Sequence, residues 1–132
     1  MARVFITGSS DGLGLMAAQL LVEWGHSVTL HARNDKRAAD ARRTLPRAQA
    51  VVTGDVSTIA AMRRVADAVN ALGRHDAVIH NVAIGYREPR RVKTADGLCQ
   101  LFAVNVLAPY HAAGPAGLSE LRHAYRRLSA AG

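Results

Sequence analysis

The stretch RVFITGSSDGLG, residues 3–14, decides the fold because it places a short apolar run directly before three glycines. Residues 3–7 are typical of a buried strand that ends at Gly8. From Asp11 onward, apolar residues recur three and four apart, which indicates a helix. A strand that passes through a glycine-rich turn into a helix is suited to bind an anion, since backbone N–H groups and the helix N-terminus both point at the ligand. A tight turn without a ligand is the alternative interpretation.

Strand and helix patterns alternate along the chain to about residue 110. The first helix is expected to stop near Gly25 and to bury one apolar stripe, made of Leu13, Met16, Ala17, Leu20, Leu21 and Trp24. Later strands are expected at residues 27–31, 50–53 and 76–81, and helices after the cap Asn34, over 59–72 and from about 94. This alternation favours an α/β fold with a parallel sheet joined by right-handed crossovers.

Length and composition limit the classes of protein that fit. The chain has 132 residues, of which 49% are hydrophobic, so a single domain with a real core is expected. No run of about 18 apolar residues is present for a membrane span, and the N-terminus lacks a signal-peptide layout, so the cytoplasm is the expected location. The lone Cys99 cannot form an internal disulfide.

The net charge of +7 raises the question of nucleic acid. Arginine pairs are scattered along the chain and few aromatic residues are available for base stacking, so no nucleic-acid partner is expected. The histidines lack the spacing of zinc ligands, and no metal site is expected.

The pattern Thr7-Gly8-x-x-x-Gly12-x-Gly14 resembles the nucleotide-binding turn of the short-chain dehydrogenase/reductase family. Three later motifs follow in that family's order: GDVS with Asp55 and Val56, HNVA with Asn81 and Ala83, and VNVLAPY with Asn105. HNVA departs from the family's Asn-Asn-Ala-Gly at two positions, His80 and Ala83. The resemblance implies a Rossmann-type doubly wound sheet over residues 1–110, truncated after about four strands in the order 3-2-1-4. Residues 111–132 then form a divergent tail, compatible with one short helix.

The resemblance also implies a cofactor site. The residues of the first turn expected to bind the cofactor are Thr7, Gly8, Ser9, Ser10, Gly12, Leu13 and Gly14. Of these, Gly8, Ser10, Gly12, Leu13 and Gly14 are expected to approach the pyrophosphate, and the hydroxyls of Ser9 and Ser10 are expected to donate to a phosphate. Asp55 and Val56 are expected at the adenine, and Asn81 and Ala83 along the path to the ribose and nicotinamide.

The end of the second strand bears on which nucleotide is bound. It reads LHARN, with Ala32 where NAD-preferring relatives carry an acid and Arg33 directly after it. A guanidinium pairs well with the 2′-phosphate of NADP, so the sequence favours NADP(H) over NAD(H). A solvated loop arginine is the alternative, and Asp11 stands where some NADP-preferring relatives place a base.

The family's catalytic serine and its Tyr-x-x-x-Lys pair have no counterpart in this chain. The residues four after its three tyrosines are Arg90, Gly114 and Ser129, and of the catalytic tetrad only Asn105 is matched. Three explanations are open, in this order: a truncated or frame-shifted product, a binding or regulatory module without catalysis, and a site completed by a second chain. A small carbonyl or alcohol substrate is expected only in the last case.

A sheet that stops at the fourth strand leaves that strand as an open edge, whose backbone groups need partners. The sequence therefore predicts a homodimer or another partner through residues 76–81 and the Asn105 helix, or a tail folded over this edge.

Overall fold

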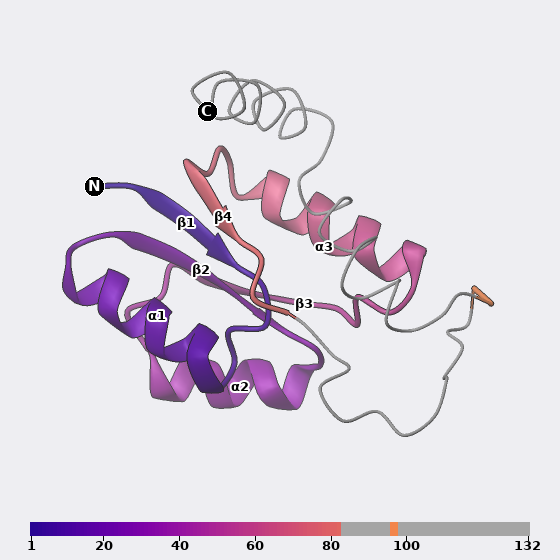
Figure 1. The fold of residues 1–132 in the computed structure, drawn as a ribbon, viewed down its shortest axis with the longest axis horizontal. Helices are drawn as coiled ribbons and strands as arrows, with labels where there is room; N and C mark the ends of the chain where they lie inside the picture. Colours follow the sequence, from indigo (N-terminus) through magenta and orange to yellow (C-terminus); the bar gives the residue numbers. More distant parts are fainter. Residues whose placement is uncertain (83–95, 98–132) are drawn as a thin grey trace, which may run out of the picture.

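The computed structural model describes residues 1–82 and 96–97. Within them the chain alternates strand and helix: β1 (Arg3–Ile6), α1 (Gly12–Glu23), β2 (Ser27–Ala32), α2 (Asp35–Thr44), β3 (Ala50–Thr53), α3 (Ile59–Ala71) and β4 (Ala77–Ile79). The strands form a parallel sheet in the order β3-β2-β1-β4, which confirms the predicted fold class and strand order (Figure 1). Ala83, Asn105 and the tail 111–132 lie outside the described residues.

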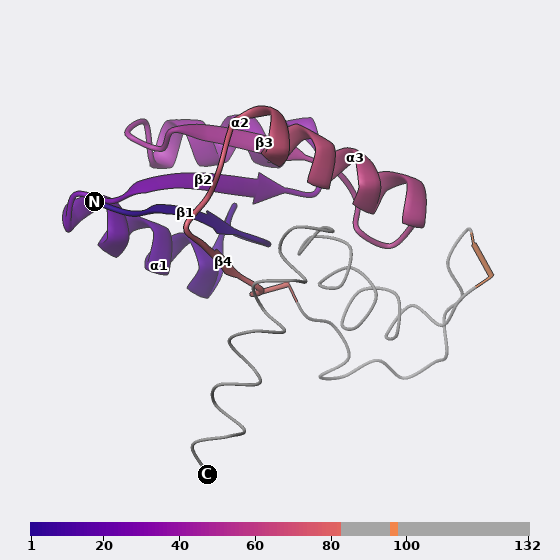
Figure 2. The same cartoon turned by 90° about the horizontal axis from the view of Figure 1, so that it is seen from above.

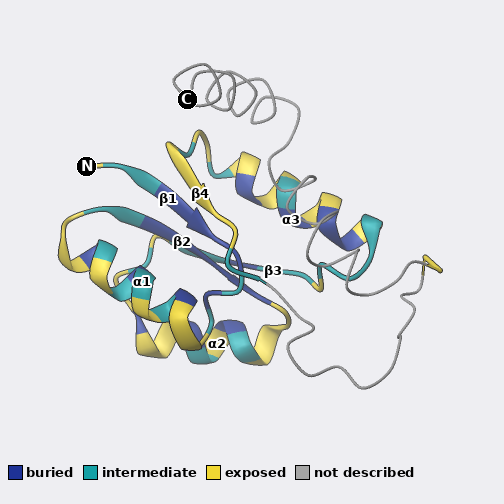
Figure 3. Cartoon of the chain, viewed as in Figure 1, coloured by how far each residue is buried: buried dark blue, intermediate teal, exposed yellow. Residues whose placement is uncertain are grey.

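The sheet separates two hydrophobic clusters, as the alternation of side chains along β1 requires. Val4 and Ile6 point to the face covered by α1 and α2, and Phe5 points to the face covered by α3. The helices accordingly lie on opposite sides of the sheet in Figure 1, and Figure 3 shows β1 and β2 largely buried and β4 exposed. Because all four strands are parallel, the loops that follow them gather at one edge, toward which the arrowheads of β1 and β2 point in Figure 2.

The predicted buried stripe of α1 is only partly correct. Gly14, Ala18 and Val22 are the buried residues of this helix, with Leu15, Ala17 and Leu21 packed beside them. Four members of the predicted stripe are exposed instead, namely Leu13, Met16, Leu20 and Trp24. The physical reason is that α1 is apolar on two faces, and the face with small side chains at positions 14 and 18 allows the closer approach to the sheet.

The other helices follow the sequence prediction closely. The Asn34 side chain accepts the N–H of Arg37 at 3.0 Å and caps α2. The Thr58 hydroxyl caps α3 in the same way, and α3 buries Met62, Val65 and Val69 as predicted. The strand β4 is shorter than expected, and its three residues are exposed at the end of the described sheet.

Candidate functional site

A cavity of about 440 Å³ opens where the loops after the four strands meet. Eight of the predicted site residues line it: Gly8, Ser10, Gly12, Leu13, Arg33, Asp55, Val56 and Asn81. Among the described residues, the lining also includes five that were not predicted as site residues: Asp11, His31, Arg37, Gly54 and Val82. The carboxyl edge of a parallel sheet is the usual place for a ligand, and the volume is within the range of about 300–1,000 Å³ typical of ligand sites.

The turn between β1 and α1 favours glycine at two positions, Gly8 and Gly12, for different reasons. Gly8 has φ +62°, and a Cβ placed on it would lie 2.6 Å from Val82 Cγ2. Gly12 has φ +57° with open space beside it. The backbone of this turn is therefore bare toward the cavity, as close approach of a phosphate group requires.

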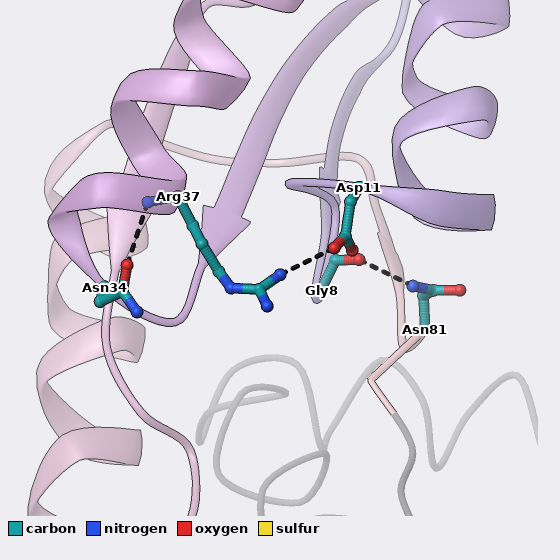
Figure 4. A network of polar contacts seen from close by, with 5 residues as sticks. All are labelled: Gly8, Asp11, Asn34, Arg37 and Asn81. Atoms are coloured by element: carbon teal, nitrogen blue, oxygen red, sulfur yellow. Dashed lines mark hydrogen bonds and ion pairs between the residues drawn. The ribbon is translucent and has the colours of Figure 1, made fainter.

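Thr7 and Asn81 hold the turn against the segment after β4. The Thr7 hydroxyl accepts the N–H of Asn81 at 3.0 Å, and the side-chain amide of Asn81 donates to Gly8 O at 2.9 Å (Figure 4). Thr7 is buried and does not line the cavity. Within the described residues, Thr7 thus anchors the turn through a partly buried hydrogen bond outside the cavity, while Asn81 both bonds the turn and lines the cavity.

Ser9 differs from the expectation that its hydroxyl faces a phosphate. It is completely buried, and its hydroxyl donates to Ile6 O at 2.7 Å and accepts the N–H of His31 at 2.8 Å. Both roles of the hydroxyl are therefore already used within the protein. Ser10, by contrast, lines the cavity as predicted.

His31 is a cavity residue that the sequence interpretation missed. It is 2% exposed, and its ring bridges two loops, since Nδ1 accepts the N–H of Gly8 at 3.0 Å and Nε2 lies 2.8 Å from Gly54 O. Burial lowers the pKa of His31, against the smaller raising effects of the Gly54 hydrogen bond and the Asp55 charge. The signal in the sequence was a histidine one residue before the end of the strand SVTLHA, whose other residues are apolar or carry a single hydroxyl.

Two guanidinium groups stand at the β2 side of the cavity. Arg33 follows β2, is exposed, and has no ion-pair partner among residues 1–82 and 96–97. Arg37 lies in the first turn of α2, and its Nη1 is 2.7 Å from the Asp11 carboxylate (Figure 4). Both side chains of this pair are well exposed, so the pair contributes at most about 1 kcal/mol to stability. A neighbouring hollow is also lined by Ser10, Asp11 and Arg37, together with Lys36.

The segment after β3 closes the opposite side of the cavity. Gly54 packs directly on α3, where a Cβ would lie 2.4 Å from Val65 Cγ2. The Asp55 carboxylate accepts the N–H of Ser57 at 3.0 Å, and Val56 packs against the cluster around Phe5. An apolar side chain and a fixed carboxylate therefore lie side by side at the cavity wall.

Two features are absent from the part of the chain that the structure describes. Residues 1–82 and 96–97 contain no group of three or more His, Cys, Asp or Glu side chains that could hold a metal ion. In the same residues, no helix has the length and apolar character needed to cross a membrane.

The chain matches the short chain dehydrogenase family over residues 2–117. It is 53% identical over 111 residues to an uncharacterized oxidoreductase of Emericella nidulans. The matched region covers 83% of this chain and 44% of that protein. The NADP active-site complex of Pseudomonas aeruginosa RhlG has a TM-score of 0.70 at 27% identity, over 85% of this chain and 45% of that one. A metagenomic short-chain oxidoreductase in complex with NADP has a TM-score of 0.67 at 28% identity, over 85% of this chain and 53% of that one.

The parallel sheet and its glycine-rich first turn define a Rossmann-type α/β protein. The chain belongs to the short-chain dehydrogenase family. It spans less than half the length of the Emericella nidulans relative.

Proposed function

We propose that this chain binds a dinucleotide, NADP(H) in preference to NAD(H), as the cofactor-binding part of a short-chain dehydrogenase. The observation that carries the proposal is the bare glycine turn facing a cavity with Arg33 and Arg37 at its β2 side. The pyrophosphate lies against Gly8, Ser10, Gly12 and the start of α1, where N–H groups and the helix dipole favour an anion. Leu13, in the first turn of α1, lines the same cavity, whereas Gly14 beside it does not.

The preference for NADP(H) rests on the charges at the end of β2. No carboxylate is present at Ala32, where it would accept a ribose hydroxyl, and Arg33 directly follows. A guanidinium forms strong paired hydrogen bonds with a phosphate but gains much less from a hydroxyl. The presence of NADP in both solved relatives described above supports this choice.

The adenine lies between Val56 and the Asp55 carboxylate, and the nicotinamide side lies toward Asn81 and Ala83. Hydride chemistry would be supplied by the bound cofactor. This chain contributes Asn105 but no Tyr-x-x-x-Lys pair, so we expect no carbonyl reduction or alcohol oxidation by the chain alone.

Isothermal titration calorimetry with NADP⁺ and NAD⁺ tests the proposal. We expect tighter binding of NADP⁺, and loss of that preference in Arg33→Ala. Arg64→Ala, which removes an exposed guanidinium from α3 on the other face of the sheet, is the matched control and should bind as the wild type does. Equal affinity for the two nucleotides in the wild type would contradict the NADP preference.

A second function is consistent with the missing catalytic residues, namely a non-enzymatic module whose assembly depends on nucleotide. The exposed outer side of β4 favours a partner or a second copy that pairs along this edge. Light scattering with and without NADP⁺ tests the assembly, and a monomer with strongly protected β4 amides would count against it. An assay of NADPH oxidation with a panel of carbonyl compounds separates this module from an enzyme completed by another chain.

A further inference from the structure

The ring of His31 connects two segments that form the cavity, the glycine turn and the segment after β3. Nδ1 accepts the N–H of Gly8 in the glycine turn, and Nε2 faces Gly54 O after β3. The backbone of His31 adds two more bonds to the turn, because its N–H donates to Ser9 Oγ at 2.8 Å and its carbonyl accepts the N–H of Ser9 at 3.0 Å. His31 is thus the one described side chain that bonds both the glycine turn and the segment after β3.

These contacts select one form of the ring. A nitrogen that accepts the Gly8 N–H carries no proton, so the neutral ring must carry its proton on Nε2 and donate it to Gly54 O. A doubly protonated ring has N–H groups at both positions. It would keep the Gly54 bond but present a donor to the Gly8 donor, which breaks the link to the turn.

We propose that His31 is a positioning residue of the dinucleotide site, which holds the glycine turn and the segment after β3 at the separation that fits the nucleotide. The inference rests on the proposed function, because the turn it holds is the one that receives the pyrophosphate. His31 acts on nucleotide binding through its bonds to Gly8 and Gly54. Nucleotide binding should also weaken in acid, since protonation of His31 releases Gly8.

The charges around His31 have opposing effects on its protonation. Asp55 lines the same cavity after β3, and its carboxylate favours the charged ring. Arg33 and Arg37 line the cavity from the β2–α2 side and oppose a further positive charge, and Asp11 is paired with Arg37. Burial acts against the charged form and is the largest effect, so the pKa of His31 lies below the usual histidine value.

Two isosteric substitutions separate the two bonds of the ring. In His31→Asn the amide oxygen takes the place of Nδ1, so the Gly8 bond is kept and the side chain no longer titrates. In His31→Gln the amide nitrogen takes the place of Nε2, so the Gly54 bond is kept and the Gly8 bond is lost. His26→Asn is the control, because Nδ1 of His26 also accepts a backbone N–H, that of Ala2 at 3.0 Å, before β2 begins and away from the cavity.

The measurement is the Kd for NADP⁺ of each folded variant between about pH 7.5 and about pH 5.5. At the higher pH, His26→Asn should bind as the wild type does. His31→Asn, which loses the Gly54 bond, and His31→Gln, which loses the Gly8 bond, should each bind about tenfold more weakly, the effect of one lost hydrogen bond. On acidification the wild type should lose affinity relative to His31→Asn. The 2′-phosphate also takes up a proton near pH 6, but its effect is common to all variants and cancels in the ratio.

The proposal is overturned if His31→Gln binds as tightly as the wild type, or if the wild type and His31→Asn keep a constant ratio of Kd over this pH range. Should the variants not fold, ¹⁵N NMR of the wild type decides. The proposal requires a neutral His31 protonated at Nε2 and a Gly8 amide whose protection against exchange, relative to the intrinsic rate at each pH, falls in acid. A neutral ring protonated at Nδ1 contradicts it. These NMR readouts need no nucleotide, so they remain informative even if the wild type binds neither NADP⁺ nor NAD⁺ and the proposed function fails.

Discussion

Gly14, in the first turn of α1, faces the side chain of Asn81 across the β1–α1 turn. A Cβ placed on Gly14 would lie 2.6 Å from Asn81 Nδ2 and 2.5 Å from Gly8 O, the two atoms joined by the hydrogen bond that holds the turn. Neither the backbone oxygen nor the bonded amide has freedom to move away. The third glycine of the motif is therefore required by packing between the helix and the strands, and it does not itself line the cavity.

Gly14→Ala should therefore weaken nucleotide binding as well as the fold. The added methyl group displaces Asn81 or Gly8, and overpacking of this kind costs about 1–3 kcal/mol in the free energy of unfolding. Urea denaturation and NADP⁺ titration measure the two effects. Gly25→Ala is the control, because Gly25 also has a positive φ of 87° but has nothing within 4 Å of its added Cβ and lies at the other end of α1. It should lose stability and keep its nucleotide affinity, and equal losses of affinity in both variants would contradict the argument.

Asp11→Asn should raise the affinity for NADP⁺ about two- to fivefold and leave that for NAD⁺ nearly unchanged, as expected when an exposed pair worth up to about 1 kcal/mol is removed. The pair with Asp11 neutralises Arg37 beside the cavity, so its removal frees a guanidinium for the 2′-phosphate. The Asp11 side chain makes no capping bond to α1, so that interaction is not lost with the charge. Calorimetry of both nucleotides measures the change.

Asp67→Asn controls for this change in net charge, because Asp67 is exposed on α3. It should leave the ratio of the two affinities as in the wild type. If Asp11→Asn raised the affinity for NAD⁺ as much as that for NADP⁺, the cause would be the change in net charge and not a contact of Arg37 with the 2′-phosphate.

The observed orientation of α1 predicts a contrast between two of its residues. Val22 is buried against the sheet, whereas Met16 is 62% exposed. Val22→Ala should lower the free energy of unfolding by about 2 kcal/mol, because it removes buried methyl groups and leaves a cavity. Met16→Gln should change it by less than about 0.5 kcal/mol. Urea denaturation of the two variants is the measurement, and a larger loss for Met16→Gln would support the stripe expected from the sequence.

The sequence was sufficient where a pattern had one physical solution. Apolar runs bounded by glycines located the strands, and Asn34 could act only as a cap before a polar helix. It was insufficient for α1, whose two apolar faces left the buried one undetermined until Gly14 and Ala18 were seen against the sheet.

The motif resemblance located most of the cavity but gave no orientation for individual side chains. Ser9 and Ser10 are adjacent and chemically identical, yet only Ser10 lines the cavity. His31 and Arg37 belong to no motif of the family pattern, because their roles depend on which loops fold next to them. The partners Gly8 and Asp11 are more than twenty residues away in sequence.

Acid should destabilise the folded chain, with His31 as one contributor. Burial lowers its pKa in the folded state, so the unfolded chain binds a proton at a higher pH than the folded chain does. The stabilising contribution is therefore complete above the usual histidine pKa of about 6.5 and is lost as the pH falls through the folded-state value. Burial also lowers the pKa values of His75 and His80, so His31 accounts for only part of the loss of stability in acid.

His31→Asn should therefore reduce the dependence of unfolding free energy on pH below about 6.5 without removing it, by up to one proton in the linkage slope. Urea denaturation of the wild type and the variant at several pH values measures this slope, and no nucleotide is needed. If the slopes of His31→Asn and the wild type coincide, then His31 takes up its proton equally in the folded and the unfolded chain, and the buried neutral ring described above is wrong.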